Sequence, residues 1–90
     1  MITTTLPGSE LIGQGLDDIA AGAVTIESLL VAIAAPRLRT LGYSVPTSPE
    51  QPELRLYELL ATQYGDGAHS RYNALIRRVV SFQRAAACAR

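Results

Sequence analysis

The chain has 90 residues, of which 48% are hydrophobic and 18% are charged, and its formal net charge is zero. This apolar content excludes a largely disordered chain, and the length predicts one domain over residues 1–90 with a modest core. A single cysteine, Cys88, excludes a framework of internal disulfide bonds. No basic leader with an apolar run precedes the first helix, so we expect a cytoplasmic protein.

The first predicted element is a helix that follows a loose leader over residues 1–8. Ser9 is a suitable N-cap, because its hydroxyl oxygen can accept a hydrogen bond from a backbone N–H one turn into the helix. Gly13 and Gly15 would each weaken this helix. They would also permit a second helix to approach closely.

A second helix is predicted to begin after Thr25. Pro36 should either kink this helix or break it, since proline lacks a backbone donor and clashes with the preceding turn. The apolar stripe continues beyond Pro36, which favours the kink. The longest apolar run, Ser28–Pro36, is far shorter than the roughly 20 residues of a membrane span. It therefore predicts a buried helix and no membrane association.

Two further helices are predicted, from about Glu53 to Tyr64 and from about Gly67 to Ala87, with Asp66 as the cap of the second. Spacings of three and four residues in the last helix are typical of a helix that packs on other helices. The apolar residues at these spacings are Ala68, Tyr72, Leu75, Ile76, Val79, Phe82 and Ala86. The predicted fold class is all-α, a small bundle or open array of about four helices.

The charges are unevenly distributed along the chain. All eight acidic residues lie at or before Asp66, with only three arginines among them, so this part carries a net charge of −5. Residues 67–90 contain five arginines and no acid, which gives +5. A molecule polarised in this way either pairs its own charges or binds a charged partner.

On a helical wheel, polar side chains border both edges of the apolar stripe of the last helix. One edge carries His69, Asn73, Arg77 and Arg84, and the other carries Arg71 and Arg78. An apolar centre with charged borders is typical of a binding surface, and also of an amphipathic helix packed on its own domain. We predict a partner-binding surface made by His69, Arg71, Tyr72, Asn73, Arg77, Arg78 and Arg84.

The residues that could carry catalysis are few. Asp66 could orient the imidazole of His69, but no nucleophile is fixed beside that pair, and Ser70 points about 100° away. One histidine and one remote cysteine, Cys88, do not form a metal site. Gly13-Gln14-Gly15 is too short for a phosphate-binding loop. We therefore expect no enzyme, no metal and no cofactor.

Two segments resemble a group of small all-α bacterial proteins, associated with antitoxins that are encoded beside nucleotidyltransferase-like toxins. These segments are LLVAIAAPRLR, residues 29–39, and AHSRYNALIRR, residues 68–78, with Ser81-Phe82 after it. The resemblance implies a small helical protein that binds a cognate enzyme and silences it. Such a toxin handles a nucleoside triphosphate, a metal and RNA, so its active site would be electropositive around phosphates and acidic around the metal. A polarised helical protein could contact both.

Two alternatives remain open from the sequence. In the first, the protein is a nucleic-acid-binding or autoregulatory module in which the arginines of the last helix meet phosphates and Asn73 lies near a base edge. The acidic first half opposes this function, because a dedicated binder is usually basic. In the second, the protein is a self-associating structural subunit that forms a homo-oligomer through the seam from Tyr72 to Phe82.

Overall fold

The computed structural model describes residues 8–46 and 50–88, and every regular element in these two ranges is helical. The elements are α1 (Ser9–Ala20), α2 (Ile26–Thr40), α3 (Pro52–Tyr64), the short 3-10 helix η1 (Gly65–Gly67) and α4 (Ala68–Cys88). The predicted all-α class is confirmed. The predicted leader lies, apart from Gly8, outside the described residues. No helix within the described ranges has the length and apolar character that crossing a membrane requires.

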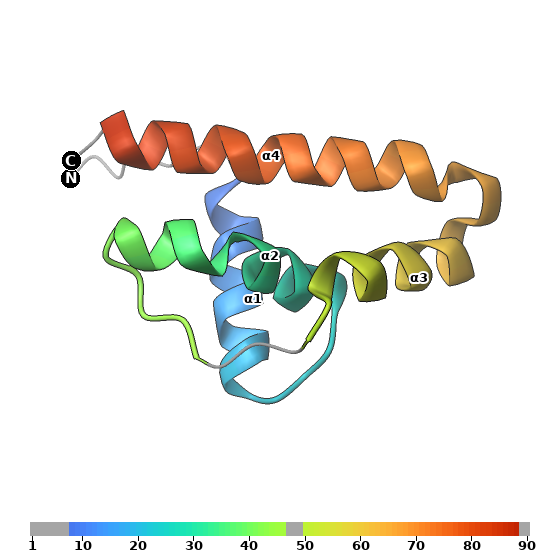
Figure 1. The fold of residues 1–90 in the computed structure, drawn as a ribbon, viewed down its shortest axis with the longest axis horizontal. Coiled ribbons are helices and arrows are strands. Elements are labelled where there is room, and N and C mark those ends of the chain that lie inside the picture. The colour runs from blue at the N-terminus through green and yellow to red at the C-terminus, as the bar shows by residue number, and fades with distance from the viewer. Residues whose placement is uncertain (1–7, 47–49, 89–90) are drawn as a thin grey trace.

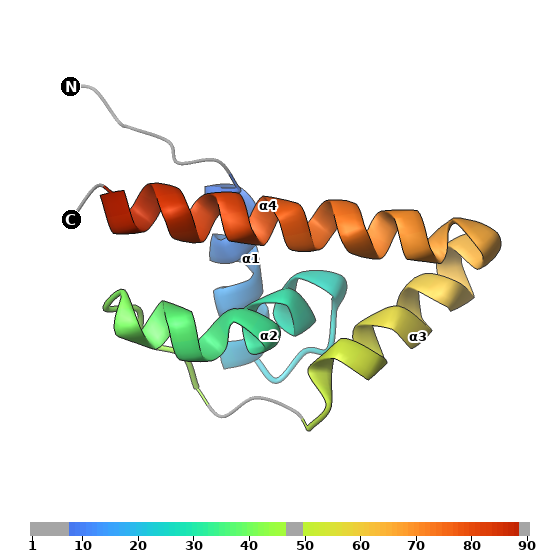
Figure 2. The same ribbon diagram turned by 45° about the horizontal axis from the view of Figure 1, so that its top comes forward.

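The longest helix, α4, sets the shape of the molecule, which measures 41 × 25 × 22 Å. Its 21 residues span about 32 Å of the longest dimension. Figure 1 shows α2 and α3 following one another along α4, while α1 crosses α2 at a steep angle. Figure 2 shows that α3 runs obliquely to α4 and that the chain turns back from α3 into α4 through η1.

The central helix of the core is α2, which is buried on nearly all of its sides, as expected of a helix that is apolar all round. Its buried apolar side chains are Leu29, Leu30, Val31, Ala32, Ala34, Ala35 and Leu38. The other helices each present one apolar stripe toward it, with Leu11 and Ile12 from α1, Leu56 and Leu60 from α3, and Ala68, Val79, Phe82 and Ala86 from α4.

Helices α1 and α2 cross in backbone contact at Gly15. A Cβ atom at this position would overlap with the backbone carbonyl oxygen of Glu27 and with a methyl group of Val31. Gly15 is buried, whereas Gly13 is exposed and a Cβ there would meet nothing within 4 Å. The expectation of a close helix approach is therefore confirmed for Gly15 and wrong for Gly13.

The start of α2 agrees with the sequence prediction. The Thr25 hydroxyl oxygen accepts a hydrogen bond from the Ser28 backbone N–H at 3.1 Å, and the Ser28 hydroxyl oxygen accepts one from the Thr25 N–H at 2.8 Å. Thr25 also donates to the Asp18 carboxylate at 2.7 Å. The Thr25 hydroxyl thus completes the capping box of α2 and also links the start of α2 to the last part of α1.

Two other predicted caps are wrong. Ser9 is the first residue of α1 and not its N-cap, because Gly8 occupies that position with φ of 78°, a left-handed conformation that glycine adopts without strain. Asp66 lies inside η1, and among the described residues its side chain makes no capping hydrogen bond. The chain enters α4 directly from this 3-10 helix. The 3-10 helix therefore stands where a side-chain cap was predicted.

Pro36 does not break α2. The helix continues to Thr40, and the Thr40 hydroxyl donates to the Pro36 carbonyl oxygen at 3.1 Å. An internal proline costs a helix about 3 kcal/mol, but Leu38 after it is fully buried, and burial of a leucine side chain offsets most of that cost. The predicted break of the helix at Pro36 is therefore wrong, and the predicted kink stays a prediction.

Candidate partner-binding site

Helix α4 divides into an inner face and two polar flanks. Val79 and Phe82 are buried in the core, while Tyr72, Leu75 and Ile76 are half-buried and pack against it. The apolar stripe predicted for this helix is thus mostly covered by the chain itself. The surface left for another molecule is on the flanks, where the polar residues of the prediction lie.

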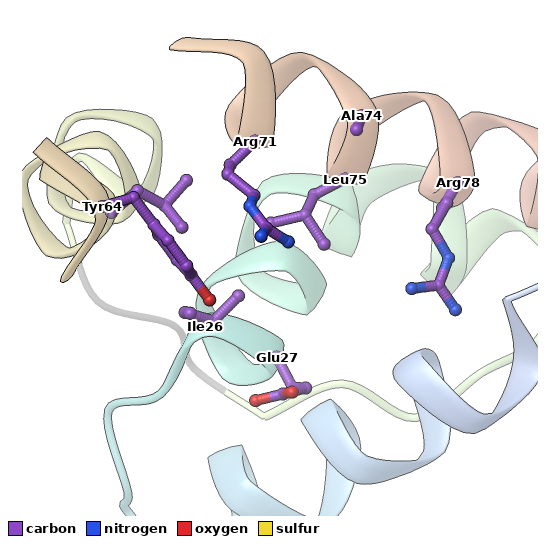
Figure 3. A pocket seen from close by; sticks show the side chains of 8 residues that line it. Ile26, Glu27, Tyr64, Arg71, Ala74, Leu75 and Arg78 are labelled. Carbon is purple, nitrogen blue, oxygen red and sulfur yellow. The ribbon is translucent and has the colours of Figure 1, made fainter. Parts of the chain in front are cut away.

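One flank of α4 forms a groove of about 250 Å³ with the start of α2 and the end of α3, which we call the α2–α4 groove. Its lining residues are Ile26, Glu27, Leu60, Tyr64, Arg71, Ala74, Leu75 and Arg78. Figure 3 shows Arg71 and Arg78 projecting from α4 toward the side that carries Ile26 and Glu27, with the ring of Tyr64 beside Arg71. The groove therefore has an apolar floor, a cationic wall and one carboxylate on the opposite wall.

The guanidinium of Arg71 is held in place by an aromatic ring. Its central carbon lies 4.5 Å from the ring centroid of Tyr64, the distance of a cation–π contact. Arg71 forms no hydrogen bond or ion pair within the described ranges. A guanidinium stacked on a ring still directs its N–H groups outward in its own plane. Arg71 is thus pre-oriented, with its donors available to an incoming carboxylate.

Arg78 is engaged within the chain. Its Nη2 donates to Glu10 Oε1 at 3.0 Å, which joins α4 to the first turn of α1. The two side chains are 51% and 68% exposed, so solvent screens this pair and its contribution to stability is small. It is the one ion pair in the part of the chain that the structure describes. The uneven charge distribution is therefore neutralised internally at a single point.

The other flank of α4 carries an aromatic and polar cluster. His69 Nε2 and Asn73 Nδ2 lie 3.2 Å apart, one turn from each other on the exposed surface. The Tyr57 ring of α3 packs against both Tyr72 and His69, with centroid distances of 5.8 and 6.4 Å. Asp66, which could have oriented His69, makes no bond to it in the described ranges; the imidazole instead lies within hydrogen-bonding distance of Asn73.

The remaining predicted residues lie elsewhere on α4. Arg84 lines a second hollow, of about 380 Å³, which we call the basic hollow; its other lining residues are Arg37, Val80, Gln83 and Ala87. Arg77 is exposed and lines neither the basic hollow nor the α2–α4 groove. The structure thus brings Arg71 and Arg78 together and places His69, Tyr72 and Asn73 in another cluster. The seven predicted residues are therefore divided among these regions and line no common pocket in the described ranges.

Sequence reasoning missed the wall of the groove that faces α4. Ile26, Glu27 and Leu60 come from α2 and α3, and their distance from α4 in sequence gives no signal that they share a surface with it. Tyr64 lies seven residues before Arg71, across η1, so helical spacing alone could not have paired them.

Within residues 8–46 and 50–88, no three His, Cys, Asp or Glu side chains lie close enough together to hold a metal ion. Cys88 is exposed and unpaired at the end of α4. The fold and this surface define the chain as a small all-α protein with a charged, apolar-floored groove. No family model matches the chain, and searches of curated proteins and of solved structures also found no match.

Proposed function

We propose that this protein is a non-catalytic, protein-binding module that binds a cognate enzyme through α4 and blocks it, as an antitoxin does. The observation that supports this proposal best is the Arg71 guanidinium, which is stacked on Tyr64 at the edge of the α2–α4 groove. A pre-oriented cation beside apolar surface suits recognition of a carboxylate-bearing protein, because arginine and aromatic residues concentrate binding energy at interfaces.

The groove offers three kinds of contact to a partner. Arg71 can receive a carboxylate in a bidentate arrangement, and Leu75 with Ile26 can cover an apolar side chain. Glu27 on the opposite wall can accept a hydrogen bond from a partner's basic or amide group. A matching partner surface is therefore an apolar residue flanked by an acidic residue and a donor, and charge complementarity of this kind selects one partner over others.

The class of partner follows from the resemblance to antitoxins encoded beside nucleotidyltransferase-like toxins. An enzyme of that class carries carboxylates around its metal, and Arg71 would pair with such a carboxylate when α4 lies across the active-site entrance. His69 and Asn73, on the other flank, would contact the rim of the entrance. The complex would form in the cytoplasm of a bacterial cell.

The first experiment identifies the partner and then tests whether this protein inhibits it. The tagged full-length chain is purified from its native host, the co-eluting enzyme is identified by mass spectrometry, and its activity is assayed with increasing amounts of this protein. We expect stoichiometric inhibition. A captured enzyme that keeps full activity at saturating protein would contradict the proposal.

The second experiment tests the surface. R71Q should weaken binding to the captured enzyme by about tenfold to a hundredfold, the effect of losing a hydrogen bond between charged groups. Y64L keeps the charge but removes the ring under it, and should weaken binding by about twofold to fivefold. R55Q changes the same charge on the exposed surface of α3 and serves as the matched control. Equal losses for R71Q and R55Q would show that the groove is not the docking site.

Nucleic-acid binding is the second candidate, and the exposed guanidinium of Arg77 favours it, because no carboxylate in the described ranges pairs with that arginine. A gel shift whose affinity falls steeply with salt would support this function. The seam proposed for self-association has less support, since Phe82 is only 2% exposed within the chain's own core.

A further inference from the structure

The basic hollow lies at the other end of α4 from the α2–α4 groove and has a different chemical character. It is lined by Arg37, Gln83 and Arg84 together with the apolar residues Val80 and Ala87. No carboxylate is among these lining residues. The hollow is therefore cationic, whereas the groove has both a cationic and an anionic wall.

The two arginines of the hollow come from different helices that are packed on one another. Arg37 precedes the fully buried Leu38 of α2, and Arg84 follows the buried Phe82 of α4. The core thus fixes the two backbones, and the fold brings two like charges to one hollow. Within the described ranges neither guanidinium has an ion pair or a hydrogen bond to the protein.

Two other arginines of the described ranges bond to their own chain, unlike Arg37 and Arg84. Arg39, two residues after Arg37, donates from Nε and Nη2 to the Val45 carbonyl oxygen at 3.3 and 3.1 Å. Arg78 pairs with Glu10. Arg37 and Arg84 differ from these in facing a shared hollow while keeping all of their N–H donors for solvent or a ligand.

The chemistry of the hollow selects its ligand. Planar guanidinium groups match the geometry of phosphate oxygens and bind them with paired hydrogen bonds, and the Gln83 amide adds a neutral donor. The Val80 and Ala87 side chains add apolar surface beside these donors. The volume of about 380 Å³ lies at the small end of ligand pockets. We propose that the basic hollow binds a diphosphate group, either as free pyrophosphate or as part of a nucleotide.

This site does not depend on the proposed function, because Arg71 and Arg78 of the α2–α4 groove are not part of it. Loss of partner binding in the groove variants would leave the basic hollow unaffected. Loss of anion binding in the hollow variants would likewise leave the groove intact.

Calorimetric titrations of pyrophosphate and of ADP into the full-length protein, at constant ionic strength, test the proposal. We expect saturable binding of pyrophosphate at one site. R37Q and R84Q should each weaken it by about tenfold or more, since each removes charge-assisted hydrogen bonds. R84K keeps the charge but loses the fork and should fall between the wild type and R84Q. R55Q is the control for charge alone and should bind as the wild type does.

Comparison of pyrophosphate with ADP distinguishes whether the site binds free pyrophosphate or the diphosphate of a nucleotide. Equal affinities would assign the site to the diphosphate group alone, and tighter binding of ADP would assign it to a nucleotide; both outcomes support the proposal. Absence of saturable pyrophosphate binding up to millimolar concentrations would overturn it, as would an equal loss in R55Q. An NMR titration of the wild-type protein gives the same answer without any variant, because pyrophosphate should shift the side-chain N–H resonances of Arg37, Gln83 and Arg84 and leave those of Arg55 in place.

Discussion

Around Gly15, α1 and α2 lie in backbone contact, and the Thr25 hydroxyl bonds the start of α2 to Asp18 of α1. The arginines on the flanks of α4, in contrast, are exposed. The first region has almost no space for change, since even one Cβ would overlap with neighbouring atoms. On the second, the ion pair of Arg78 with Glu10 is exposed to solvent.

This difference separates residues that stabilise the fold from residues that are available for binding. Exposed ion pairs contribute about 0–1 kcal/mol to stability, so the pairing of Arg78 with Glu10 adds little to the stability of the domain. We propose that the arginines beside the apolar-floored groove and in the basic hollow bind ligands outside the chain. The inner face of α4, in contrast, stabilises the fold, as the crossing of α1 and α2 does.

The largest effect is expected for a substitution that tests whether the inner face of α4 is part of the core. Phe82 is 2% exposed and its ring lies 5.7 Å from that of Tyr43, so F82A should lower the free energy of unfolding by about 3–5 kcal/mol. L54A, at a position that is 53% exposed, should change it by less than about 0.5 kcal/mol. Urea denaturation followed by circular dichroism measures both. Similar values for the two variants would mean that α4 is not packed as described.

The next effect concerns the helix crossing. G15A should lower the free energy of unfolding by about 1–3 kcal/mol, because the added methyl group forces α1 away from α2. G13A is the matched control in the same helix, where the methyl group has free space, and it should raise the free energy of unfolding by up to about 1 kcal/mol. Opposite signs in thermal or urea unfolding are the expected result. A stabilising G15A would contradict the close crossing.

The smallest expected effect concerns the capping box. T25A removes the hydrogen bonds to the Ser28 N–H and the Asp18 carboxylate and should cost about 1 kcal/mol. T62A is a suitable comparison, since Thr62 is exposed on α3 and its hydroxyl donates only to the Glu58 carbonyl oxygen of its own helix. That variant should not be less stable than the wild type, because alanine is the better helix former at an exposed position. Equal midpoints of thermal unfolding for T25A and the wild type would contradict a stabilising role of the Thr25 cap.

The helical pattern of the sequence was sufficient for the all-α class and for the Thr25 cap, because both depend on residues close together in the chain. It was misleading at Ser9 and Asp66, where the backbone of Gly8 and the 3-10 helix take over the expected role of a side chain. The polar flanks of α4 could be located on a helical wheel, but their partners could not. Packing of segments that are distant in sequence places Tyr64 against Arg71, Glu27 across the groove and Arg37 near Arg84. Local spacing in the sequence does not encode such contacts.

Cross-saturation NMR on the complex with the captured enzyme tests the central claim most directly, since it reports which amide protons of this protein lie at the interface. We expect intensity losses along α4 between Arg71 and Arg78 and in the first turn of α2 at Ile26 and Glu27, with the exposed side of α1 around Gly13 unaffected. Losses confined to α1, with α4 unchanged, would contradict the assignment of the α2–α4 groove as the docking site.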